Sequence, residues 1–405
     1  MYRVATAISD EARVYNNQSG KGLTYWCPTI NLSRDPRWGR DEENYGEDPY
    51  LTGILAVQFI KGLQGDDPKY LKTVATAKHF VANNYEKERH SHSSDMDERN
   101  LREYYLPAFE MCVKEGRVAS IMSAYNALNG VPCCANPKLL TDILREEWGF
   151  DGFVTSDCGA IQDIFDNHKY TTTIEEACAK AIKAGEDMNC GGMFQQHTLQ
   201  AVAQGLLTEA DVDSALVRIF ESRFRLGEFD DDVKWRNIDP SMLNCKEHQD
   251  LAMQSALESI VLLKNSPAAS GTPLLPLDPR KTVAIIGPFG NMVMLGGYSG
   301  TPTETSTLYE AFARRFDVTI VDENTQFEKY DDKKGSLVAE ANGCDGNLGN
   351  VKAGDWAMYR HVDFGEDGSS LLIVRSATDN GKDKPTIMKV YLDNMSGTPA
   401  LTVTL

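Results

Sequence analysis

The chain has 405 residues, 41% of them hydrophobic, so it can bury a large core, and its length predicts two or three domains. Its 41 Lys and Arg against 59 Asp and Glu give a net charge of −18, which disfavours nucleic acid and anionic membrane surfaces as partners. No apolar run is long enough to span a bilayer, and residues 1–20 lack the pattern of a signal peptide. The nine Cys do not reach the density of a disulfide scaffold, and they leave the redox compartment open.

The first half of the chain alternates between two kinds of segment. Segments with helical spacing cover residues 97–115, 173–184 and 199–226, the last of them ending at Gly227. Apolar β-type runs lie at residues 24–30, 73–81, 118–125, 152–157 and 186–189. This alternation predicts a parallel sheet in an α/β fold, and the length of the repeat favours an eight-stranded barrel over an open doubly wound sheet.

The second half begins with a polar, Pro-containing linker at residues 230–245. An amphipathic helix at 249–257, a Pro- and Gly-rich loop at 266–279 and a strand at 282–286 then predict a second α/β unit. The turn after that strand lacks the glycine spacing of a nucleotide site. From about residue 323, short β-type runs separated by Gly and Asp predict an all-β tail.

Polar side chains follow four of the predicted strands. Asp157 ends the run at 152–157, and the other three strand ends supply Arg40, Lys78 with His79, and Tyr125. The carboxyl ends of parallel strands meet at one edge of a barrel, so we expect these groups to converge. Cations beside a carboxylate keep it ionised, as a nucleophile requires, and the same donors can bind sugar hydroxyls.

Each of these residues also has a structural interpretation. Arg40 can pair with a neighbouring carboxylate, Lys78 and His79 can be a buried pair bonded to backbone, and Tyr125 can be core packing. Asp157 can cap the following helix. The hypothesis of a sugar site depends on all of them lying together.

Four segments together resemble glycoside hydrolase family 3. They are Arg34-Asp35-Pro36-Arg37-Trp38-Gly39-Arg40, Ala77-Lys78-His79-Phe80-Val81-Ala82-Asn83-Asn84, Met122-Ser123-Ala124-Tyr125-Asn126-Ala127-Leu128-Asn129-Gly130-Val131-Pro132 and Trp148-Gly149-Phe150-Asp151-Gly152-Phe153-Val154-Thr155-Ser156-Asp157. The resemblance covers about residues 1–322 and implies a retaining, exo-acting β-glycosidase without metal or organic cofactor. It implies a (β/α)8-type barrel lacking its first units, then part of an α/β sandwich domain.

The resemblance also implies roles for single residues. Asp157 matches the family's nucleophile, and Arg40, Lys78, His79 and Tyr125 match residues around the sugar in the first subsite. Met122 matches a wall of that pocket, although core packing is nearly as good an explanation. Cys158, where β-glucosidases usually have Trp, is similar to the β-xylosidase branch, as are residues 187–191 and 296–302. The expected substrate is therefore a xylo-oligosaccharide, with β-glucosidase activity or a catalytically incomplete, carbohydrate-binding fragment as alternatives.

The chain departs from the family at the general acid/base, for which no residue matches. One branch of the family uses a His–Asp pair on a barrel loop. The loop 86–95 contains Glu86, Glu88, His90, His92 and Asp95, but the surrounding residues do not follow that branch's pattern. A metal site at His90 and His92 is disfavoured because no third ligand is evident. The acid/base is therefore left unassigned, and no metal is expected.

The tail around Trp356, Tyr359 and Phe364 resembles an incomplete carbohydrate-binding module of family 6, a β-sandwich whose aromatics either stack on sugars or fill the core. The predicted domains are thus a barrel at 1–229, a linker at 230–247, a partial sandwich domain at 248–322 and a β-rich tail at 323–405. By the same resemblance the full-length parent is expected in the periplasm or outside the cell.

Overall fold

The computed structural model describes residues 1–267, 271–280, 283–286, 289–302, 304–316 and 318–321, and beyond these only short stretches at 332–334, 338–342, 345–349, 356–358, 387–390, 398–399 and 401–404. The chain divides into two compact units, Met1–Val261 and Leu262–Leu405. Each unit is described by itself. Among the described residues, no helix is both long enough and apolar enough to cross a bilayer.

The first unit is built on a parallel sheet of four strands in the order β1-β2-β4-β7. The strands are β1 (Thr24–Tyr25), β2 (Val74–Phe80), β4 (Ser120–Ser123) and β7 (Phe153–Ser156). Isolated bridges extend the sheet at both edges, from Thr29 to Lys78 and from Thr155 to Met188. All five predicted β-type runs thus take part in one parallel arrangement, and among the described residues it remains open rather than closing into a barrel.

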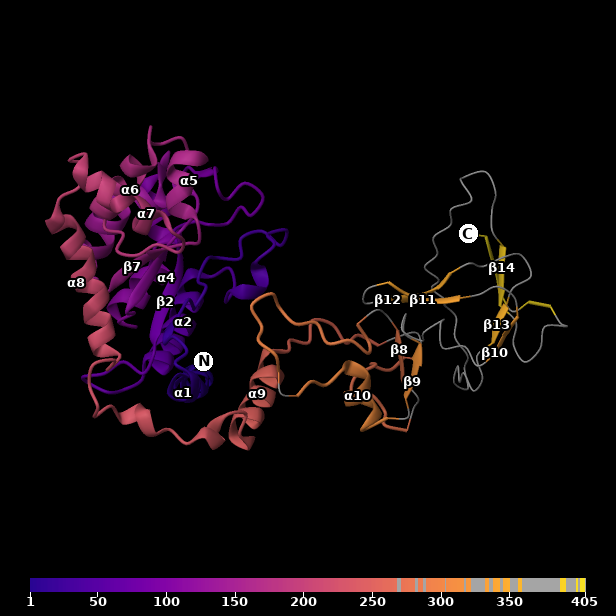
Figure 1. Ribbon diagram of the computed structural model, residues 1–405. Coiled ribbons are helices and arrows are strands. Elements are labelled where there is room, and N and C mark those ends of the chain that lie inside the picture. The colour runs from indigo at the N-terminus through magenta and orange to yellow at the C-terminus, as the bar shows by residue number, and fades with distance from the viewer. Residues whose placement is uncertain are drawn as a thin grey trace. The chain divides into compact units, whose positions relative to one another are not determined.

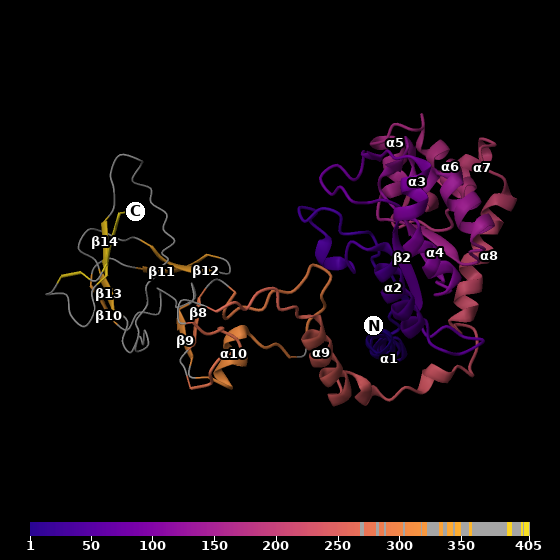
Figure 2. The ribbon, with the colours of Figure 1, turned by 180° about the vertical axis from the view of Figure 1, so that it is seen from behind.

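Helices surround these strands, as the opposite views in Figure 1 and Figure 2 show. Helices α6 and α7 contact each other, α2 and α4 contact β2, and α8 contacts β7. The main helices of this unit are α1 (Tyr2–Ser19), α2 (Pro49–Gln64), α4 (Pro107–Lys114), α5 (Ala160–Asp166), α6 (Ile174–Ala184), α7 (Met193–Ala203), α8 (Glu209–Arg225) and α9 (Lys246–Ser259). The fold is therefore α/β, as the alternating pattern predicts.

Two predicted helices are interrupted. The stretch 199–226 is not one helix, because α7 ends before Gly205, which adopts φ 73°, and Thr208 starts α8 with a capping box to Asp211. The stretch 97–115 divides into α3 (Glu98–Asn100), the π-helical segment η2 (Leu101–Tyr105) and α4, which begins at Pro107. Proline has no N–H to continue the helical hydrogen bonds, so it marks the start of a new segment.

Short elements fill the connections. They are η1 (Asp41–Glu43), β3 (Ser93–Ser94), β5 (Ala127–Leu128), β6 (Val131–Pro132), η3 (Cys133–Ala135), the π-helical η4 (Lys138–Glu147), η5 (Lys234–Asn237) and η6 (Pro240–Met242). The predicted linker at 230–245 thus contains only two short helical turns, in keeping with its polar, Pro-containing sequence. Helix α9, expected at 249–257 as the start of the second unit, belongs instead to the first unit, because it packs on α1, where His248 Nδ1 lies 2.7 Å from Glu11 Oε1.

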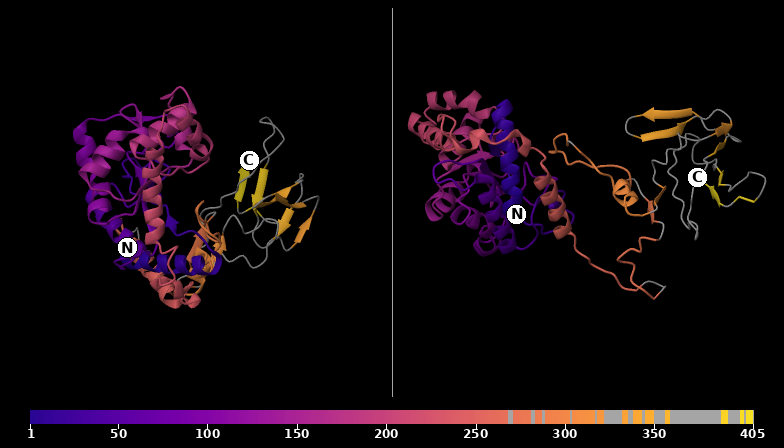
Figure 3. Two further views of the ribbon diagram at one scale, coloured as in Figure 1. Left: turned by 60° about the vertical axis from the view of Figure 1, so that its left-hand side comes forward. Right: turned by 90° about the horizontal axis from the view of Figure 1, so that it is seen from below.

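A buried arginine joins the beginning of the first unit to its end. Arg13 on α1 is 3% exposed, and its guanidinium donates to the carbonyls of Lys72, Leu71 and Leu226 at 2.5 to 3.0 Å. Figure 3 shows α1 in indigo as one long helix. Since Leu71 and Lys72 precede β2 and Leu226 follows α8, one side chain satisfies backbone groups from distant parts of the chain.

In the second unit, β8 (Val283–Ile286) pairs in parallel with β9 (Val318–Val321), and α10 (Leu308–Ala313) lies between them in the chain. This is the α/β alternation that the sequence predicts after the linker. The tail contributes three antiparallel pairs from β10 (Asp332–Lys334) with β13 (Trp356–Met358), β11 (Val338–Asn342) with β12 (Asp345–Gly349), and β14 (Ile387–Val390) with β15 (Leu401–Thr404). The predicted aromatics Tyr359 and Phe364 lie outside the described residues.

Candidate functional site

Asp157 lies directly after β7, at the carboxyl end of the parallel sheet. It is 8% exposed; its Oδ1 accepts from the N–H of Cys158 at 2.8 Å, whereas its buried Oδ2 makes no hydrogen bond. Burial raises the pKa of this carboxyl, while the Cys158 N–H, Tyr125, Lys78 and Arg40 oppose the rise. One carboxylate oxygen is therefore held by a backbone N–H, and the other makes no hydrogen bond.

His79, near the end of β2, approaches the free oxygen. Its Nε2 lies 3.4 Å from Asp157 Oδ2 and 3.2 Å from a guanidinium nitrogen of Arg40. Burial lowers the pKa of His79 well below its usual value, and Arg40 and Lys78 add to the effect. A neutral ring is therefore expected, with Nε2 as the acceptor for Arg40.

Asn31, a residue that the sequence did not single out, holds the His79 ring on its Nδ1 side. Its Oδ1 lies 2.8 Å from both the backbone N and Nδ1 of His79, and its amide donates to the His79 carbonyl at 2.9 Å. Because Asn31 Oδ1 can only accept, Nδ1 carries the proton and Nε2 faces Arg40 as an acceptor. The signal in the sequence was weak, since Asn31 lies on an irregular loop after β1.

Arg40 is held by a carboxylate that sequence reasoning also missed. Its guanidinium makes a two-pronged interaction with Glu43, with both N–O distances at 2.8 Å. The neighbouring carboxylate with which Arg40 pairs is thus Glu43, on η1. Lys78 lies close enough to interact electrostatically with Arg40, Glu43 and Asp157, and burial lowers its pKa. Both cations thus stand near Asp157, as the strand-end argument predicts.

Tyr125 follows β4 and is 7% exposed. Its hydroxyl donates to the carbonyl of Cys158 at 2.9 Å, so it touches the residue after Asp157, and burial raises its pKa. Two residues of the loop after β2 cover its ring, with His90 edge-on at 4.4 Å and the Arg89 guanidinium at 4.7 Å. His90 Nδ1 in turn lies 2.6 Å from Asp163 Oδ2 on α5.

A disulfide joins Cys158 to Cys190, and the sequence analysis did not predict it. The bridge follows from the fold, because Ser156 and Met188 are neighbours at one sheet edge and Gly159 N donates to the Cys190 carbonyl at 2.9 Å. The sequence did contain a hint of this bridge, because Cys158 and Cys190 each follow a predicted strand. The residue after Asp157 is therefore covalently tied to the adjacent strand end.

Met122 is as inaccessible as His79. It lies on β4 opposite Thr155 and is 1% exposed, so it presents almost no surface. Its place in the substrate pocket stays a prediction. Within the parts of the chain that the structure describes, no group of three or more His, Cys, Asp or Glu is arranged to hold a metal ion.

Two family models match the chain. Residues 12–222 match the glycosyl hydrolase family 3 N terminal domain, and residues 326–405 match the carbohydrate binding module of family 6. The first match includes every candidate residue at the sheet edge. The second coincides with the tail predicted to be all-β.

Curated relatives match over most of this chain but less than half of their own length. A probable beta-D-xylosidase 7 of Arabidopsis thaliana is 41% identical over 76% of this chain and 42% of its own length. A xylan 1,4-beta-xylosidase of Xylanibacter ruminicola is 42% identical over 72% of this chain and 34% of its own. The chain therefore spans about two fifths of the length of the first of these relatives.

Solved structures of related enzymes are also similar. An exo-beta-xylosidase in complex with a xylobiose aziridine probe has a TM-score of 0.74 and 34% identity, covering 79% of this chain and 42% of its own. A beta-glucosidase of Listeria innocua in complex with glucose has a TM-score of 0.70 and 28% identity, covering 80% of this chain and 45% of its own.

Proposed function

This chain belongs to glycosyl hydrolase family 3, and we propose that it is the nucleophile-bearing part of a retaining exo-β-xylosidase acting on β-linked oligosaccharides. The observation that carries the proposal is the buried, unbonded Oδ2 of Asp157 beside His79, Arg40 and Lys78. A carboxylate used as a nucleophile needs a free oxygen and positive potential around it.

The reaction would proceed in two displacements. Asp157 Oδ2 attacks the anomeric carbon, a carbon–oxygen bond forms, and the bond to the leaving sugar's oxygen breaks as that oxygen takes up a proton. Water then attacks the same carbon and gives one proton to the group that protonated the leaving oxygen. The carbon–oxygen bond to Asp157 breaks, and the product has retained configuration. We assign no residue to the proton donor.

The surrounding residues would have distinct roles. Arg40, aligned by Glu43, and Lys78 would bind sugar hydroxyls and keep Asp157 ionised. His79, whose Nε2 accepts from Arg40, would border the same subsite. Tyr125 would shape the pocket beside Cys158, and Met122 would form one of its walls. We further propose that the open parallel sheet is part of a (β/α)8-type barrel and that the tail binds carbohydrate. We also propose the predicted order of barrel, partial sandwich domain and β-rich tail, with α9 packed on the barrel domain.

A pentose is the preferred sugar. Relatives named as xylosidases support this choice, and the disulfide at Cys158 puts a compact, fixed group next to Asp157. Xylose lacks the exocyclic CH₂OH of glucose, so a restricted pocket favours it. The similarity to a beta-glucosidase with bound glucose keeps glucosidase activity as the second candidate. The disulfide also favours an oxidising compartment for the protein.

Mass spectrometry after incubation with a 2-fluoro-xylosyl reagent bearing a good leaving group tests the proposal. A single sugar adduct is expected on the peptide that contains Asp157, absent in Asp157→Ala and present in the control Asp151→Ala, where the aspartate is exposed. The 2-fluoro-glucosyl reagent should label more slowly. Folded protein that neither reagent labels would instead indicate a catalytically incomplete, carbohydrate-binding part of the enzyme.

A further inference from the structure

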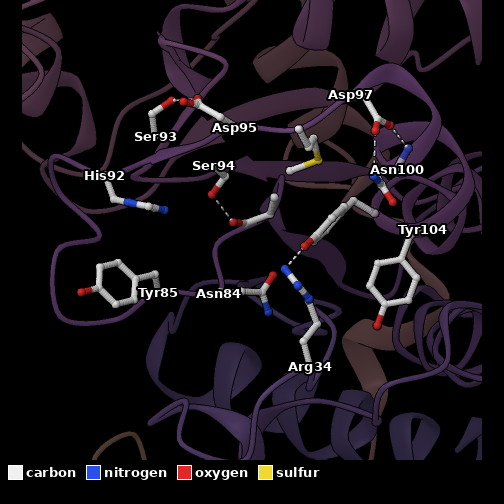
Figure 4. A pocket seen from close by; sticks show the side chains of 13 residues that line it. Arg34, Asn84, Tyr85, His92, Ser93, Ser94, Asp95, Asp97, Asn100 and Tyr104 are labelled. Atoms are coloured by element: carbon white, nitrogen blue, oxygen red, sulfur yellow. Dashed lines mark hydrogen bonds between the residues drawn. The ribbon is translucent and has the colours of Figure 1, made fainter.

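A cavity of about 870 Å³ lies beside the candidate active site, and none of that site's residues lines it. It is formed by the loop after β2, the segments α3 and η2, and Arg34 (Figure 4). The lining includes Arg34, Asn84, Tyr85, His92, Asp97 and Tyr104. The cavity lies entirely within the first unit.

The aromatic part of the lining is partly exposed and held in place. Tyr85 is 43% exposed, and its ring meets that of His92 edge-on at 4.9 Å. On the opposite side, Tyr104 lies at 5.2 Å from Tyr105, whose hydroxyl accepts from Arg34. Tyrosine offers an apolar face and a polar tip, which suits a sugar ring with its C–H face and rim of hydroxyls.

The polar groups are also fixed by hydrogen bonds. Asn84 donates to the Leu32 carbonyl at 2.6 Å, and Asp97 accepts from the backbone and side chain of Asn100 at 2.8 and 3.0 Å. Side chains already held in place lose little freedom when a ligand binds. Among the lining residues, the positive charge of Arg34 is outweighed by Asp95 and Asp97, which disfavours an anionic ligand such as a phosphate.

The loop between Tyr85 and Asp97 has two faces. Arg89 and His90 lie over Tyr125, next to the residue that follows Asp157, whereas Tyr85 and His92 line the cavity. The same loop therefore borders both the Asp157 site and the cavity, but different residues of it face each one. We propose that the cavity is a second carbohydrate-binding site, which takes a neutral oligosaccharide separately from the sugar at Asp157. This inference takes its ligand class from the proposed function.

Hydrogen–deuterium exchange of the whole chain locates the binding. In Asp157→Ala, which would not hydrolyse the ligand, xylotetraose should protect peptides covering residues 92–105, which line the cavity, and xylose alone should not. Cellotetraose, tested in parallel, reports whether pentose or hexose chains are preferred. Protection confined to the Asp157 peptide or to residues 326–405, or no protection at all, would overturn the inference. Hydrolysis of an aryl xyloside, measured separately, shows whether the proposed function fails independently.

Substitutions give the second test. With Tyr85→Ala added to Asp157→Ala, the xylotetraose concentration that gives half-maximal protection at residues 92–105 should rise about tenfold. Tyr85→Phe should restore the original concentration because stacking needs only the ring. Tyr50→Ala is the matched control, since Tyr50 lies on α2, is 69% exposed and is outside the lining. Equal protection in Tyr85→Ala and Tyr50→Ala would refute a site built on Tyr85. An unchanged rate on an aryl xyloside in Tyr85→Ala is expected, because the cavity is separate from Asp157.

Discussion

Replacing Asn31 with Ala tests whether the candidate site depends on a side chain outside the recognisable motifs. Asn31 is 3% exposed and makes three hydrogen bonds to His79, two through Oδ1 and one through its amide. In Asn31→Ala the N–H, Nδ1–H and carbonyl of a residue that is 1% exposed lose their partners. At roughly 1 kcal/mol for each net hydrogen bond, plus desolvation of unpaired groups, the free energy of unfolding should fall by about 3–5 kcal/mol.

Urea unfolding followed by tryptophan fluorescence measures this loss, since Trp38, Trp148 and Trp235 are buried in the first unit. Asn17→Ala is the control, because Asn17 is exposed and makes one hydrogen bond, to the Trp235 carbonyl. That variant should lose about 1 kcal/mol or less. A loss in Asn31→Ala no larger than in the control would show that Asn31 does not hold His79 as described.

Three further predictions concern a buried acid, the disulfide and the partner of Arg40. Burial raises the pKa of Glu186, so the folded protein binds more protons at this residue than the unfolded protein does, and the free energy of unfolding falls as pH rises above about 4.5. In urea titrations, Glu186→Gln should therefore be more stable than the parent at pH 7.5 and have no advantage at pH 4. Opening the disulfide across 32 residues in Cys158→Ser/Cys190→Ser should lower the free energy of unfolding by about 3–4 kcal/mol, and equal urea midpoints with and without reductant would contradict this. Glu43→Gln weakens the two-pronged contact with Arg40 and should raise KM for an aryl xyloside about tenfold with a smaller change in kcat, provided that the proposed hydrolysis occurs.

The sequence predicted the strands well because apolar, β-branched runs bury themselves on both faces of a parallel sheet. It also predicted that five residues would gather at one edge, because the carboxyl ends of parallel strands lie at the same edge of a sheet. These residues are Asp157, Lys78, His79, Arg40 and Tyr125. Closure of the barrel is a property of the whole ring of strands, so local patterns could not establish it.

What the sequence did not predict depends on contacts through space. Asn31 and Glu43 lie on loops, where no periodicity marks a residue's partner. The Cys158–Cys190 bridge depends on the register that sets Thr155 beside Met188, which composition does not contain. The break at Gly205 was missed for another reason: continuous helical spacing outweighed the turn and capping signals that were present.

The contacts of Arg13 have a consequence for how the chain is made. Its guanidinium bonds to the carbonyl of Leu226, a residue 213 positions later, so this buried cation cannot reach its native set of acceptors until the ribosome has released nearly all of the first unit. Until then α1 must either expose Arg13 to water or bury it without all of its carbonyl acceptors. Completion of the unit should therefore be a late and cooperative event, and nascent chains stalled before Leu226 should be cut far more readily by proteases than those stalled beyond it.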